Sequence, residues 1–347
     1  MMPLMKTRSF SPWILALSFA VAAGPLTAPL CAQKKKDQIV KPIAGPRAAA
    51  LRTTWLYISP NRGSQKIDRV APGREMVIAE RSGSWLRVFA NTDIVEVHSS
   101  EDEPLIGSDE TTPPVSGWLE ARGIVEEATP NGDQIMMGEA ANQEALASDP
   151  RGPANAAQTA RLLYRRVVEI FSSSPLAPEA AWRAADIHWQ ILKADVMSRP
   201  SAKERDPYMR AQIDEEDMKK VIKFFPHTRQ ADMAAFDLID NKLCGDWQGQ
   251  EKCPEKESEI YEKYAAEHPD GPRTAQALYQ AVYRQCVLVD MFTADQNDKK
   301  ADAAKNNARD LAARLRDKFP QSDYAARATA LVFKVDQGVP VYGIDQK

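Results

Sequence analysis

A short helix break recurs four times in the C-terminal half of this 347-residue chain. In each copy a Phe or His followed by Ser or Pro ends an apolar stretch, and an aromatic or small apolar residue follows ten residues later among alanines. The copies are Phe171-Ser172 to Trp182, Phe225-Pro226 to Phe236, His268-Pro269 to Tyr279, and Phe319-Pro320 to Ala330. Because Pro ends helices and Ala lets helix axes approach closely, this recurrence predicts stacked helix pairs. Such stacks present extended surfaces for binding other proteins.

The residues around these breaks follow the 3.6-residue period of a helix from residue 155 to residue 337. In the first pair Leu163 and Val167 share one face, opposite Arg161 and Arg165. This basic stripe, continued by Arg166, is interpreted as a solvated face, with contact to an acidic peptide as the alternative.

One break resembles the turns of tetratricopeptide-type repeats in bacterial envelope proteins: Phe319-Pro320-Gln321-Ser322. A second break, Phe225-Pro226-His227-Thr228, is nearly the same. This resemblance covers residues 155–337 and implies an α-solenoid of about eight helices that binds protein or peptide partners without catalysis. Successive breaks are 54, 43 and 51 residues apart, more than the roughly 34 of a regular repeat. The array is therefore expected to be degenerate, with one insertion at Ser198–Pro207.

Residues 51–125 have a different pattern, with short β-branched and aromatic runs separated by turns such as Pro72-Gly73 and Ser82-Gly83. Short strands at this spacing predict a small β-barrel. The sequence resembles a bacterial SH3 domain, and the matching residues are Leu56-Tyr57-Ile58-Ser59-Pro60, Ile67 to Val70, Pro72-Gly73, Val77, Ser84-Trp85-Leu86-Arg87-Val88 and Gly117-Trp118-Leu119. The resemblance implies binding of cell-wall peptide or protein, with Tyr57 as a candidate contact.

An acidic insertion at 91–116 departs from the SH3 pattern. It is interpreted as a solvated loop or, alternatively, as a recognition arm for a basic partner. Residues 126–154 contain strong turn signals and are predicted to be a linker between the two modules. Residues 338–347 are assigned to a C-terminal tail.

The first 32 residues have the pattern of an export signal, with Lys6 and Arg8 preceding an apolar run of 11 residues. Cleavage near Cys31 is expected to leave a flexible mature N-terminus at 33–50 and no membrane span. Lipidation of Cys31 is the less favoured alternative, because Leu30 stands where a lipobox has a small residue. The predicted location is the periplasm or the outer membrane.

Export permits disulfides, and Cys244 and Cys253 bracket a turn-rich loop between two predicted helices. We predict that they form a structural disulfide, worth about 2–3 kcal/mol in the chain-entropy description. Cys286 lies among Val282, Val287 and Val289 and is predicted to be a buried free thiol.

Nothing in the sequence indicates catalysis, a cofactor or a metal. There is no Gly-rich phosphate loop, and His188 has no partner at metal-ligand spacing. A net charge of −3 gives no reason to expect nucleic acid.

The favoured interpretation is therefore a non-enzymatic envelope scaffold, binding an envelope protein or peptide through the array with a second contact from the SH3-like module. The first alternative is a cell-wall sensor that binds peptidoglycan mainly through the SH3-like module. The second is an unrecognised hydrolase.

Overall fold

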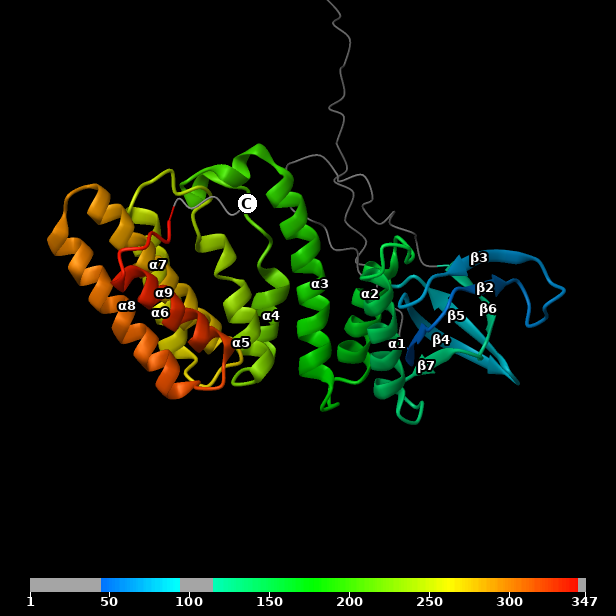
Figure 1. The fold of residues 1–347 in the computed structure, drawn as a ribbon. Coiled ribbons are helices and arrows are strands. Elements are labelled where there is room, and N and C mark those ends of the chain that lie inside the picture. The colour runs from blue at the N-terminus through cyan, green and yellow to red at the C-terminus, as the bar shows by residue number, and fades with distance from the viewer. Residues whose placement is uncertain (1–44, 94–114, 343–347) are drawn as a thin grey trace, which may run out of the picture. The chain divides into compact units, whose positions relative to one another are not determined.

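The computed structural model describes residues 45–93 and 115–342. The predicted export signal, Cys31 and most of the acidic insertion lie outside these residues. A β-sheet is followed by a helical array, as the sequence patterns predict (Figure 1). In the described ranges no helix is both long and apolar enough to cross a membrane.

The described N-terminal part forms an antiparallel sheet of seven strands in the order β3-β2-β6-β5-β4-β1-β7. The strands are β1 (Arg47–Ala50), β2 (Thr54–Tyr57), β3 (Lys66–Val70), β4 (Glu75–Ser82), β5 (Trp85–Ala90), β6 (Val115–Glu120) and β7 (Ile124–Glu126). Alternating residues of the central strands, such as Leu86 and Val88, point into a core shared with Leu56 and Leu119. The predicted turn at Ser82-Gly83 joins β4 to β5, with Gly83 at a φ of 58°.

Strand β1 lies within the stretch predicted to be a flexible mature N-terminus. Its three alanines are fully buried. Ala48 and Ala50 contribute to the core of the sheet, whereas Ala49 packs with the first helices. Small side chains suit this strand because both of its faces are covered.

Helix α1 (Gly132–Ala147) lies within the stretch predicted to be a linker. It packs along α2 (Ala156–Ile170) and touches β7. Its buried face is narrow and includes Met136 and Ala140. This segment is therefore a packed helix between the sheet and the repeats, which corrects the linker prediction for its central part.

Eight α-helices occupy residues 156–336, in agreement with the predicted number. After α2 they are α3 (Ala177–Ser198), α4 (Glu216–Phe224), α5 (Arg229–Asp237), α6 (Lys252–Glu267), α7 (Thr274–Ala294), α8 (Asp298–Lys318) and α9 (Asp323–Asp336). Each helix packs on its pair partner across a break, α2 on α3, α4 on α5, α6 on α7 and α8 on α9. The second helices of the pairs also meet, α3 with α5 and α7 with α9.

The four break residues adopt one backbone conformation. Phe171, Phe225, His268 and Phe319 each follow the last helical residue, with φ between −119° and −129° and ψ between 51° and 61°. Each donates its backbone N–H to the carbonyl four residues earlier. The recurring sequence motif is therefore a recurring structure, and the next helix begins four to six residues later.

The predicted insertion after the first pair contains two short 3-10 helices, η1 (Pro200–Lys203) and η2 (Pro207–Met209). A third, η3 (Asp240–Lys242), follows α5. The predicted Cys244–Cys253 disulfide is present, with the Cα atoms 6.0 Å apart. Cys286 is a buried free cysteine, also as predicted, and burial raises the pKa of its thiol to about 12.

Candidate protein-interaction face of the helical array

The aromatic residues of the recurring motif lie at equivalent places on the second helix of three pairs. Trp182 is on α3, Phe236 on α5 and Tyr279 on α7, and all three are half-buried. Tyr324 on α9 extends the series, because its ring centroid is 5.5 Å from that of Tyr279. We call these four residues the aromatic face.

Polar contacts connect the aromatic face from helix to helix. The indole Nε1 of Trp182 lies 3.4 Å from Oδ2 of Asp237, the neighbour of Phe236. The Arg273 guanidinium, just before α7, lies 5.9 Å from the Phe236 ring centroid. These interactions link α3 to α5 and α5 to the start of α7, and the Tyr279–Tyr324 contact links α7 to α9.

Carboxylates concentrate where α3 meets α5. Trp189, seven residues after Trp182 on α3, has its indole Nε1 3.4 Å from Oδ2 of Asp240, which also accepts a 2.6 Å hydrogen bond from Lys193. Burial and the negative charge of Asp186 raise the pKa of Asp237 to about 7. A carboxyl with this pKa carries a partial charge near neutral pH and is stabilised in its ionised form by a nearby cation.

The predicted contact Arg161 is an interior residue. It is 6% exposed, and its Nη2 lies 3.3 Å from Oδ2 of Asp217 on α4. His188 on α3 makes a 2.9 Å hydrogen bond to the same carboxylate. Burial opposes ionisation of Asp217, but the hydrogen bond from His188 and the charge of Arg161 hold its pKa well below its usual range. This network joins three helices, and Arg161 is not on the solvated face expected from the sequence.

Arg166, from the same stripe, is 2% exposed and reaches the sheet. Its Nε donates a 2.9 Å hydrogen bond to the carbonyl of Gly73, and its Nη2 lies 2.6 Å from Asp93. Arg165 is more exposed and pairs with Glu169 one turn along α2. Of the predicted basic stripe, only Arg165 therefore remains accessible for contact with a partner.

The absence of a side chain at Gly73 allows helix α2 to lie close to the sheet. Its φ is +75°, and a Cβ at this position would lie 2.7 Å from the Cβ of Leu162 on α2. Glycine therefore serves both the turn and the packing of α2.

Tyr57, the other predicted contact, lies on β2 and pairs with Trp118 on β6. Its half-buried ring packs edge-on against Trp85 at 5.5 Å. On the same side of β2, Trp55 is 39% exposed, with the Lys66 ammonium 4.3 Å from its ring centroid. Tyr57 thus belongs to an accessible aromatic cluster on the sheet, on a different element from Arg161 and Arg165.

A buried carboxylate anchors the disulfide loop. Glu257 on α6 is 1% exposed, and its Oε1 accepts hydrogen bonds from the backbone N of Cys244 at 2.9 Å and Trp247 Nε1 at 3.1 Å. Its Oε2 accepts from Arg284 on α7 at 2.8 Å. The sequence alone did not single out Glu257, because its partners come from two other segments, the disulfide loop and α7.

Within residues 45–93 and 115–342, no group of three or more His, Cys, Asp or Glu side chains is placed to hold a metal ion. Of the strongly perturbed groups, Asp217 and Asp237 have hydrogen-bonding partners, and the pKa of Cys286 is raised by burial and by the charges of Asp290 and Asp336.

Among the solved structures that match the chain are three helical proteins, each at 14% identity. They are "DHF79 filament" (59% of this chain, 96% of that one, TM-score 0.20), "Crystal structure of de novo designed helical repeat protein DHR64" (60%, 94%, 0.23) and "DHF58 filament" (60%, 93%, 0.22). No curated protein matches the sequence. A family model described as tetratricopeptide repeat matches residues 196–332, so the array from the end of α3 to α9 carries a tetratricopeptide-type repeat.

Proposed function

We propose that this protein is a non-enzymatic scaffold that holds a protein or peptide partner on the aromatic face. The observation that carries the proposal is this series of half-buried aromatic side chains, linked by contacts from α3 to α9. Three of its four residues lie in the tetratricopeptide-type repeat, a module that generally binds proteins. Half-buried aromatic side chains supply apolar contact area with little loss of conformational entropy on binding.

The partner we propose carries a basic residue that docks at the α3–α5 end of the face. Burial and the negative charge of Asp186 disfavour the ionisation of Asp237 there. A Lys or Arg side chain between the two carboxylates would favour the ionised form of Asp237. The basic groups at the other end, such as Arg327 beside the Tyr324 ring, favour an acidic residue further along the same partner.

The location and the second contact are also proposals. Export to the periplasm or outer membrane is supported by the sequence pattern at 1–32, and a disulfide is compatible with it. We propose that the sheet is an SH3-like module whose aromatic cluster at Tyr57 and Trp55 adds a weak second contact. Two weak contacts on one chain give useful avidity.

Site-specific photo-crosslinking in cells tests the binding face. A photoreactive residue at Gln190 on α3 or Arg327 on α9, both exposed, should capture the same partner. A matched photoreactive residue at Asn306 or Asp310, exposed on α8, should not. Capture only from the α8 positions would contradict the proposed face.

The charge requirement is tested by Asp186→Asn combined with Asp237→Asn. This pair should lower capture from Gln190 by about tenfold, an interaction energy of roughly 1.4 kcal/mol. Unchanged capture at low salt would refute the proposed basic contact.

A further inference from the structure

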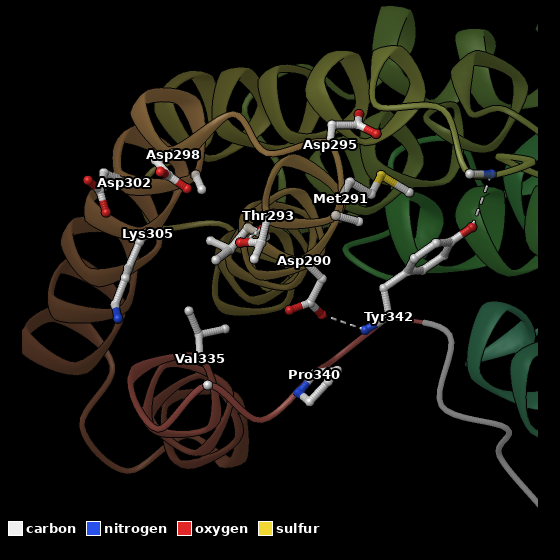
Figure 2. A pocket seen from close by; sticks show the side chains of 15 residues that line it. Asp290, Met291, Thr293, Asp295, Asp298, Asp302, Lys305, Val335, Pro340 and Tyr342 are labelled. Carbon is white, nitrogen blue, oxygen red and sulfur yellow. Dashed lines mark hydrogen bonds between the residues drawn. The ribbon is translucent and has the colours of Figure 1, made fainter.

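The chain's own residues 338–342 are bound to the array as a peptide segment without regular secondary structure. Helix α9 ends at Asp336, and Gly338, with a φ of 66°, reverses the direction of the chain. The backbone N atoms of Val341 and Tyr342 then both donate to Oδ2 of Asp290 on α7, at 2.5 and 2.8 Å. Figure 2 shows the bond from Tyr342. One carboxylate oxygen that accepts from two successive backbone N–H groups recognises a bent main chain whatever its sequence, because successive N–H groups of an extended strand point to opposite sides.

The side chains of the segment add specificity. Val341 packs on the apolar core that α7 and α9 share. The Tyr342 ring centroid is 6.0 Å from that of Trp247, which is in turn 6.2 Å from Tyr283. The Tyr342 hydroxyl accepts a 3.2 Å hydrogen bond from the backbone N of Gly249 in the disulfide loop. An aliphatic residue followed by an aromatic one therefore fits this site.

A hollow of about 920 Å³ opens beside the bound segment, between α7, α8 and the chain end. Asp290, Asp295, Asp298 and Asp302 line it together with Lys305. Figure 2 shows Asp298 and Asp302 side by side on α8, across the hollow from Pro340. The Lys305 ammonium pairs with Asp336 at 3.4 Å, so it does not offset this acidic wall. The surplus of negative charge favours a cationic side chain in the hollow.

The segment is held by few contacts. Val339 is 44% exposed and Pro340 is also exposed, and the described part of the segment forms no helix or strand. Release therefore costs two hydrogen bonds to Asp290, one to Tyr342 and a modest apolar area, and it leaves the helices paired.

We propose that this site on α7 is a peptide-binding site that residues 338–342 occupy as an internal competitor. Its external ligand is a peptide with an aliphatic-aromatic pair, a main-chain bend at this pair and a neighbouring Lys or Arg for the acidic hollow. This inference rests on the proposed scaffold function and adds a regulated second site, distinct from the aromatic face.

A fluorescent synthetic peptide with the sequence of residues 338–347 is the probe. It should bind saturably to a variant that ends at Gln337, and at least tenfold more weakly to the full chain, where the site is already filled. Asp290→Asn in the shortened variant should weaken binding at least fivefold. The matched control is Asp310→Asn, because Asp310 is exposed on α8 and does not line the hollow. It should change the binding affinity for the probe less than twofold. A probe peptide carrying Pro340→Lys, at a position that lines the hollow, should bind more tightly, and added salt should reduce this gain.

Far-UV circular dichroism and a melting curve establish that each variant is folded. If the shortened chain does not fold, Tyr342→Ala in the full chain releases the segment by removing its ring contacts, and this variant must then bind the probe. Failure of every folded variant to bind the probe overturns the inference. Crosslinking from Gln190 and Arg327 does not depend on this site, so partner capture there without probe binding leaves the proposed function intact.

Discussion

The buried carboxylate of Glu257 is expected to contribute strongly to the stability of the folded chain. Replacing Glu257 with Ala leaves Arg284, whose side chain is 8% exposed, without its ionic partner. It also leaves the N–H groups of Cys244 and Trp247 without their acceptor. Removing one partner of a buried ion pair costs about 3–5 kcal/mol, and each orphaned donor about 1–3 kcal/mol. Because these costs overlap at one carboxylate, we expect Glu257→Ala to lower the free energy of unfolding by about 4 kcal/mol.

Two further variants separate the contributions. Glu257→Gln keeps an acceptor for the two N–H groups and loses only the ion pair, so its cost should be about 1–3 kcal/mol. Combining Glu257→Ala with Arg284→Met removes the orphaned charge, and a double-mutant cycle should give a coupling of about 1–3 kcal/mol.

Urea unfolding of the full chain, followed by far-UV circular dichroism, measures these differences. Glu259→Ala, an exposed glutamate on the same helix, is the control and should change stability by less than about 0.5 kcal/mol. A loss below 1 kcal/mol for Glu257→Ala would show that water or a rearranged partner replaces the carboxylate, and the reasoning would fail.

Three further predictions concern other parts of the chain. Replacing Cys244 and Cys253 with Ser should cost about 2–3 kcal/mol in urea unfolding and abolish the sensitivity to reductant, and equal stability with and without reductant in the parent chain would contradict this. Gly73→Ala should lower stability by at least about 2 kcal/mol, because it adds a Cβ against Leu162 at a positive φ, whereas a neutral effect on the melting temperature would disprove the close packing. Asp237 has a raised pKa of about 7 in the folded chain, so the folded state binds the extra proton and stability should fall as the pH rises from about 4 to about 7. Asp237→Asn should reduce the dependence of the melting temperature on pH between about 4 and 7 and should stabilise the chain above pH 7. An unchanged pH dependence would refute the raised pKa of Asp237.

The structural features that the sequence predicted well are set by residues close together in the chain. The breaks at Phe171, Phe225, His268 and Phe319 are set by neighbouring residues and by helix periodicity, so all four appear in the structure with one conformation. The Cys244–Cys253 disulfide was predictable because both residues flank one short loop.

Contacts between distant segments account for what was missed. Arg161 and Arg166 were interpreted as part of a solvated stripe, but Asp217 and Asp93 neutralise them from 56 and 73 residues away. Strand β1 and helix α1 bury mainly small residues and Met136, which fit narrow spaces that only the folded neighbours define. The burial of Glu257 has the same origin.

The unequal ends of the helical array have a consequence for the order in which it opens. At one end α1 and the sheet cover α2, and Arg166 ties that helix to Gly73. At the other end α9 leaves Phe333 64% exposed and Ala330, the fourth motif residue, uncovered. In a repeat array each repeat is stabilised by contacts with its neighbours, so the end with fewer neighbours unfolds first. Amide protons of α8 and α9 should therefore exchange with solvent sooner than those of α2 and α3, giving the chain a defined direction of unfolding.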